Sequence, residues 1–167
     1  SEVIHVADRE GDIYELYRDC AYLGEKFLIR ASHNRDINKS VRRGSSDEKL
    51  FDTLESSKAA GVVTIKINSA QPGKKYRKAK LTVIYKKISM PPPHNRTLNN
   101  SNNYLPMVEM TAIMAIEKNP PKKEVPLKWI LLTNLQVDSL AGAIDKVQLY
   151  SMRWNIELLH KIMKSGF

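Results

Sequence analysis

The sequence is poor in cysteine and has no long apolar run, and both absences narrow what the protein can be. Among 167 residues there is one cysteine, Cys20, which excludes an internal disulfide, so a reducing cytoplasm is the simplest expectation. A membrane-spanning helix needs about 20 consecutive apolar residues, and no stretch approaches that length. The opening segment SEVIHVADRE holds neither a basic leader nor a long apolar stretch, so we expect no signal peptide and no membrane association.

Motifs for several kinds of chemistry are also missing. The four histidines are scattered and do not show the spacing of zinc ligands. They are His5, His33, His94 and His160. We find no internal repeat, no glycine-rich phosphate loop, and no Ser/His/Asp or Cys/His constellation. The sequence therefore indicates neither a zinc module nor a nucleophilic hydrolase.

Positive charge is what the sequence has in excess. Its formal net charge is +9, and residues 33–100 alone contain 15 Lys and Arg against 5 Asp and Glu, a net of +10. The whole surplus therefore lies in this segment. Because each phosphate that Lys or Arg neutralises releases condensed counterions, such a surplus suits a nucleic acid. The alternative is a soluble protein that is merely basic.

The first third of the chain predicts a βαβ unit. An apolar strand at about residues 3–7 runs into a polar turn, and apolar residues then recur at helical spacing over residues 13–23. Asp12 is a plausible N-cap of this helix and Gly24 a plausible stop. A second strand follows at about residues 26–31, so we expect two parallel strands joined by a right-handed crossover.

The middle of the chain predicts an antiparallel β segment, after a brief amphipathic turn at residues 50–54. Three stretches rich in β-branched residues, GVVTIKIN, KLTVIYKKI and VEMTAIMAI, are separated by basic or Pro- and Asn-rich connectors. A further strand is expected at residues 127–132, then a helix that starts near Asp138 and a second one over about residues 149–164. The predicted fold class is α/β, with a core of residues 1–32 and 124–167 interrupted by a basic β insertion over residues 33–123.

Asp8 is a candidate metal ligand because it follows directly on an apolar strand. Sites in open α/β sheets form at such strand ends, and a carboxylate fixed there is a good ligand for a hard cation. The alternative is structural, since Asp8 or Asp12 could simply cap the next helix.

The last helix carries a polar stripe. At 3.6 residues per turn, its members fall on one narrow face. They are Tyr150, Arg153, Glu157, Lys161 and Lys164. A carboxylate among cations suits a metal-assisted phosphodiester site, in which the carboxylate binds the ion and the cations hold phosphates. The opposite arc would then face a core, and it comprises Met152, Leu158, Leu159, Ile162 and Met163. A solvated face with ordinary i,i+4 pairs is the alternative.

Trp129 stands in an otherwise aliphatic strand. Most such tryptophans belong to a core, and the functional alternative is a platform on which an unpaired base stacks.

Four motifs together resemble one protein family. The pattern Tyr150-x2-Arg153-x3-Glu157-x6-Lys164 is similar to the YREK signature of bacterial insertion-sequence transposases. VADREGDIYEL resembles the strand of that family's second catalytic aspartate, which corresponds to Asp8. Arg30 and Trp129 match an arginine used near the transposon end and a tryptophan that accommodates a flipped base. The match covers nearly the whole chain and is weakest over residues 33–105.

The resemblance implies an RNase H-like catalytic domain of the DDE type with a β insertion. In the family, two Asp and one Glu hold two divalent ions, normally Mg²⁺ and alternatively Mn²⁺. The family nicks double-stranded DNA at the transposon end, forms and reopens a hairpin, and joins the freed end to target DNA. Asp8 and Glu157 would be catalytic metal ligands here. The DNA-binding residues would be Tyr150, Arg153, Lys161, Lys164, Arg30 and Trp129.

The family's first aspartate lies on an earlier strand, and no residue before Asp8 matches it. We therefore expect a fragment or degenerate copy of a bacterial, nucleoid-associated transposase, inactive by itself and dimeric only in the complete protein. Two alternatives remain open at this point. One is a non-catalytic DNA-binding module derived from a transposase, and the other is a different RNase H-like nuclease.

Overall fold

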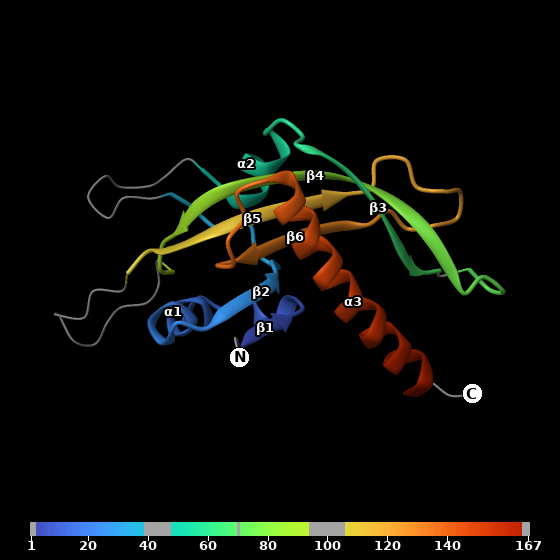
Figure 1. The fold of residues 1–167 in the computed structure, drawn as a ribbon, viewed down its shortest axis with the longest axis horizontal. Coiled ribbons are helices and arrows are strands. Elements are labelled where there is room, and N and C mark those ends of the chain that lie inside the picture. Colours follow the sequence, from blue (N-terminus) through green and yellow to red (C-terminus); the bar gives the residue numbers. More distant parts are fainter. Residues whose placement is uncertain (1–2, 39–47, 70, 94–105, 165–167) are drawn as a thin grey trace.

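The computed structural model describes residues 3–38, 48–69, 71–93 and 106–164, without the side chains of residues 157–162. The helices and strands follow one another in the order shown in Figure 1. They are β1 (Ile4–Ala7), the 3-10 turn η1 (Arg9–Gly11), α1 (Tyr14–Leu23), β2 (Lys26–Arg30), α2 (Leu50–Glu55), β3 (Gly61–Asn68), β4 (Tyr76–Met90), β5 (Val108–Ile116), β6 (Lys128–Thr133) and α3 (Leu140–Lys164).

The six described strands form one curled, mixed sheet in the order β1-β2-β6-β5-β4-β3 (Figure 1). β1 and β2 pair in parallel with α1 between them, which confirms the predicted βαβ unit. The four other pairings are antiparallel. The predicted α/β class is therefore confirmed.

Helices cover both faces of the sheet, because alternate residues of each strand point to opposite sides. On β2, Phe27 and Ile29 belong to the core under α1 and α2, whereas Leu28 belongs to the core under α3. On β6, Ile130 faces α1 and α2, and Trp129 faces α3. We call these the α1 face and the α3 face of the sheet.

The basic β segment continues this sheet directly. β5 pairs with β6, for example Ala112 opposite Leu132, and β6 pairs with β2. β4 begins at Tyr76 and is longer than predicted, since it includes part of the basic stretch interpreted as a connector. The strands of the predicted insertion and those of the predicted core share one sheet, so the sheet marks no boundary between them. The limits of the insertion, residues 33–123, therefore stay a prediction.

Two predictions about helix ends and lengths were wrong. A single helix, α3, replaces the two expected ones, because no Gly or Pro occurs between Gly142 and the end of the helix at Lys164. The N-cap of α1 is Ile13, which makes no side-chain cap, whereas Asp12 binds other partners. Gly24 does end α1 as predicted, in the left-handed conformation with φ 72°.

Candidate functional site

Asp8 follows the last residue of β1 and is held by three contacts to one oxygen. Its Oδ1 accepts a hydrogen bond from the backbone N–H of Arg9 at 2.8 Å, which caps the 3-10 turn η1. The Tyr150 hydroxyl donates to the same oxygen at 3.1 Å, and Arg30 Nη1 lies 3.8 Å away. The capping interpretation is thus confirmed for the 3-10 turn. The same carboxylate also meets two residues of the transposase-like motifs.

Tyr150 is fully buried on the α3 face of the sheet. Its ring packs edge-on against Trp129, with 5.0 Å between ring centroids and an interplanar angle of 76°. Burial, together with the negative charge of Asp8, raises the pKa of Tyr150. The phenol therefore stays protonated and acts as a donor to Asp8.

Trp129 is 1% exposed and lies between two aromatic rings. Besides Tyr150 it contacts Trp154, at 5.6 Å between centroids. The interpretation as a core residue is confirmed. Stacking on an unpaired base stays a prediction, and it requires the indole to become accessible first.

Arg30, the last residue of β2, lies on the α3 face next to Asp8. Its Nη2 donates to the backbone oxygen of Lys128 at 3.3 Å. Arg30 also lines a shallow hollow of about 220 Å³ together with Arg9 and Lys128. Lys128 is already paired with Glu55. Arg9 follows Asp8 in the chain, whereas Arg30 lies 3.8 Å from it. The two arginines favour an anionic ligand in this hollow.

The remaining motif residues belong to α3, which the structure describes only in part beyond Tyr150. Arg153 is half-buried and Lys164 is exposed at the end of the helix. The side chains of Glu157 and Lys161 lie outside the described residues. Glu157 is seven residues after Tyr150, so its Cα lies about 10 Å further along the same side of the helix. The approach of Glu157 to Asp8 therefore stays a prediction.

The predicted buried face of α3 was wrong where it can be checked. Met152 and Met163, expected in a core, are 63% and 60% exposed. The helix instead buries Ala143, Val147 and Tyr150, which follow the i, i+4, i+7 spacing. Tyr150, expected on the polar stripe, instead packs into the core beside Trp129, and this turns the buried side of the helix toward the sheet at that point.

Asp12 is a site residue whose role the sequence did not indicate. Its buried carboxylate accepts hydrogen bonds from the Tyr17 hydroxyl at 2.7 Å, from the backbone N–H of Ser32 at 2.7 Å and from Arg35 Nε at 3.2 Å. It therefore fastens η1, which carries Asp8 at its start, to the chain that leaves β2. No local sequence signal reports these partners.

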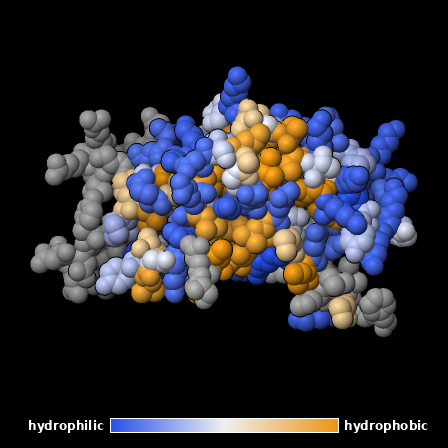
Figure 2. Space-filling model, viewed as in Figure 1, coloured by the Kyte–Doolittle hydropathy of each residue, from blue (hydrophilic) through white to orange (hydrophobic). Residues whose placement is uncertain are grey.

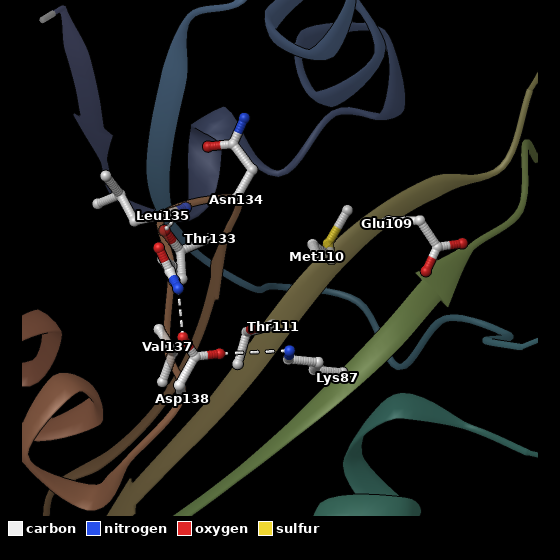
Figure 3. A pocket seen from close by; sticks show the side chains of 10 residues that line it. Lys87, Glu109, Met110, Thr111, Thr133, Asn134, Leu135, Val137 and Asp138 are labelled. Atoms are coloured by element: carbon white, nitrogen blue, oxygen red, sulfur yellow. Dashed lines mark hydrogen bonds and ion pairs between the residues drawn. The ribbon is translucent and has the colours of Figure 1, made fainter.

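A second polar hollow, of about 200 Å³, lies where β6 leads toward α3 (Figure 3). Both carboxylates that line it already have partners. Lys87 Nζ lies 3.3 Å from Asp138 Oδ1 and Gln136 also donates to Asp138, while the Ser89 hydroxyl donates to Glu109. The hydrogen bonds from Gln136 and Lys87 lower the pKa of Asp138. We interpret the pair of Lys87 and Asp138 as a structural link between β4 and the segment before α3.

No protein-family model matches this chain. What the fold and geometry establish is a mixed α/β protein with an aspartate, an arginine and a buried tyrosine in contact at one strand end. The described helices include none that combines the length and apolarity needed to cross a membrane.

Proposed function

We propose that this chain is part of the RNase H-like catalytic domain of a DDE transposase, which cleaves and joins DNA with divalent cations. One observation carries the proposal. The motif around Asp8 and the motif around Tyr150 are 142 positions apart in the sequence, and they are joined by a hydrogen bond between those two side chains. Two motifs of one catalytic site are expected to converge in this way, whereas unrelated surface features are not.

Asp8 suits the part of a metal ligand. The three contacts described above all go to Oδ1, so we assign its second oxygen, Oδ2, to the cation. Mg²⁺ and Mn²⁺ prefer carboxylate oxygens, and Glu157 on the helix that holds Tyr150 would supply the second ligand. Such ions activate the attacking oxygen and stabilise the leaving one. The family's first aspartate has no counterpart among the 167 residues, so we expect this chain by itself to bind DNA without cutting it.

Arg30 beside Asp8 and the cations of α3 would hold the phosphates of double-stranded DNA. Arg30 is closest to Asp8, and Arg153, Lys161 and Lys164 follow along α3. Tyr150 would contribute to DNA binding indirectly, by holding Asp8, because its hydroxyl is engaged with that carboxylate and its ring is buried. We further propose that the complete transposase is a dimer and acts in the bacterial cytoplasm.

Binding of duplex DNA over a series of salt concentrations tests the role of Arg30. Loss of one phosphate contact in Arg30→Ala should weaken binding and flatten the slope of log K against log salt by about 0.9. Arg18→Ala removes the same charge from α1, on the other face of the sheet, and should leave the slope nearly unchanged. Equal slopes in wild type and Arg30→Ala would count against the site.

Cleavage tests the roles of the carboxylates. In a transposase that contains this segment and the first aspartate, Glu157→Ala should abolish Mg²⁺-dependent cutting of an end-containing duplex and leave end binding largely intact. Equal loss of binding in Glu157→Ala and Arg153→Ala would contradict the division of roles. Robust cutting by these 167 residues alone, dependent on Glu157, would overturn the proposal that they need a third carboxylate.

A further inference from the structure

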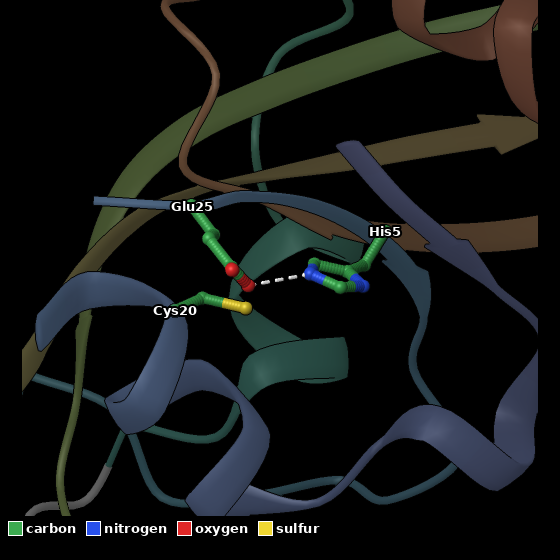
Figure 4. A group of neighbouring side chains, drawn as sticks. All are labelled: His5, Cys20 and Glu25. Carbon is green, nitrogen blue, oxygen red and sulfur yellow. Dashed lines mark hydrogen bonds and ion pairs between the residues drawn. The ribbon is translucent and has the colours of Figure 1, made fainter. Parts of the chain in front are cut away.

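Three side chains of metal-binding type meet on the α1 face of the βαβ unit (Figure 4). They are His5 on β1, Cys20 on α1 and Glu25 in the turn before β2. One ligand atom from each lies within 4.8 Å of the other two. His5 Nε2 and Glu25 Oε2 are 2.6 Å apart, and the Cys20 sulfur points toward both.

The backbone brings these groups together for identifiable reasons. Alternation along β1 places Val6 toward α3, so His5 points to the opposite side, where α1 packs. Gly24 ends α1 in the left-handed conformation, and the N–H of Glu25 donates to the Cys20 carbonyl at 2.9 Å. This tight turn keeps Glu25 beside Cys20.

We infer that His5, Cys20 and Glu25 form a zinc site, separate from the Asp8 site on the other face. Thiolate, imidazole and carboxylate are the three ligand types that proteins use for Zn²⁺. Cys20 is buried, whereas the side chains of His5 and Glu25 are 41% and 38% exposed, so the ion can enter from solvent and keep a water as its fourth ligand. Bonds of about 2.0–2.3 Å put tetrahedral ligands roughly 3–4 Å apart, which these half-exposed side chains reach by small rotations.

Binding requires a change of protonation. Burial, with the nearby carboxylates of Glu25 and Asp19, raises the pKa of the Cys20 thiol. The thiol is therefore protonated before the metal binds, and Zn²⁺ displaces that proton to solvent as the Zn–S bond forms. His5 binds as the neutral ring through Nε2, which replaces its hydrogen bond to Glu25 by a bond to the metal.

Zinc titration against a chromophoric chelator tests the inference. The Asp8→Asn protein serves as the background, so that the proposed Mg²⁺ site cannot contribute. It should bind one Zn²⁺ per chain, and His5→Ala should weaken binding by roughly 100-fold or more, since loss even of an outer-shell partner costs about 10–100-fold. His33→Ala is the matched control, because His33 is exposed and lies outside the cluster. It should bind zinc as tightly as the background.

Cobalt substitution gives a readout specific for the thiolate. Co²⁺ should produce a near-ultraviolet thiolate-to-cobalt band in the background protein and none in Cys20→Ser. Absence of the band in the background, or equal zinc affinity in His5→Ala, would reduce the cluster to an ordinary His–Glu pair and overturn the site. Because Cys20 is buried, circular dichroism should verify that Cys20→Ser folds. If it does not fold, the zinc affinity of Glu25→Gln is the test, and it should be lower than that of the background protein. None of these outcomes depends on DNA binding or cleavage.

Discussion

Tyr150 joins the core of the molecule to its candidate site. Its ring packs against Trp129, and its hydroxyl reaches Asp8. Tyr150→Phe keeps the packing and removes one hydrogen bond to a carboxylate. We expect a loss of about 1.5 kcal/mol in the free energy of unfolding, the lower end for a bond to a charged group.

Urea unfolding at neutral pH measures this effect. Tyr22→Phe is the matched control, because Tyr22 is largely exposed and should change stability by less than about 0.5 kcal/mol. An equal, negligible effect of both substitutions would mean that the Tyr150–Asp8 bond contributes nothing to the fold.

At this scale the sequence was informative where a motif existed. Asp8, Arg30 and Tyr150 were predicted as site residues, and they are in contact or close to it. The partners of Asp12 and the cluster around Cys20 were not predicted. Both depend on side chains brought together by the turn before β2 and the chain after it, and no local pattern encodes such contacts.

The turn between β1 and α1 is the element that positions Asp8, and Gly11 permits its close approach to the sheet. A Cβ on Gly11 would lie 2.8 Å from the Ala7 Cβ and 3.3 Å from the Ile29 Cγ2. Gly11→Ala should therefore force η1 away from β1 and cost about 1–3 kcal/mol of stability.

Thermal unfolding compares this variant with Gly142→Ala in α3. A Cβ on Gly142 meets its neighbours at ordinary distances, 3.6 Å or more, so the substitution should stabilise the helix by about 0.5 kcal/mol. Opposite signs for the two variants are the expected result. If Gly11→Ala is as stable as wild type, the turn has room to move and does not fix Asp8.

A buried ion pair connects β4 to the end of β5. The two Arg77 terminal nitrogens donate to Glu117 at 2.6 and 2.9 Å, and the backbone N–H of Leu127 donates to the same carboxylate. The hydrogen bonds from Arg77 hold the pKa of Glu117 below its ordinary value. Because the folded-state pKa is lowered, the stabilisation is complete above the unfolded pKa of roughly 4 and is lost as pH falls through the folded value.

Glu117→Gln should thus lower stability by about 1.5 kcal/mol near neutral pH, since it removes the charged partner of two hydrogen bonds while Glu124, 3.3 Å from Arg77 Nε, still balances the guanidinium. The deficit relative to wild type should shrink as pH is lowered below roughly 4 in urea unfolding experiments. Glu55→Gln disrupts the exposed pair with Lys128 and should cost less than about 1 kcal/mol. A deficit that does not vary with pH would contradict the lowered pKa.

Elements with strong alternation or helical spacing were predicted well, and their faces less so. Every predicted strand is present, and α1 ends where Gly24 indicated. The prediction of the buried side of α3 was wrong. Helical spacing placed Tyr150 on the polar stripe, and no local pattern indicates that a tyrosine on such a stripe is buried. The sheet decides this through Trp129.

For the whole molecule, strand order was beyond the sequence. The pairing of β2 with β6 joins residues about a hundred positions apart, for example Leu28 with Thr133, and it makes the basic β segment continuous with the βαβ unit. Local patterns predict that strands exist, whereas their neighbours depend on packing throughout the fold.

The end of the β3–β4 hairpin lies against α3 at Asn155. Asn155 accepts a hydrogen bond from the backbone N–H of Asn68 at 3.3 Å and donates to the Lys66 carbonyl at 3.3 Å. A hollow of about 330 Å³ opens there, lined among others by Lys74, Lys75, Tyr76 and Asn155. Hydrophilic residues dominate this end of the molecule, where the hairpin lies at the right of the view (Figure 2). If DNA follows α3 past Asp8, these lysines are next on its path.

Lys74→Gln combined with Lys75→Gln should therefore flatten the salt dependence of duplex binding by about 1.8, two phosphates' worth. The control pair, Lys80→Gln with Lys86→Gln, removes equal charge from the α1 face, because both residues alternate with Leu81 and Val83, which face α3. Net charge alone would make the two double variants equal. A path along the α3 face makes only the first pair change the slope, and fluorescence anisotropy over a salt series distinguishes these results.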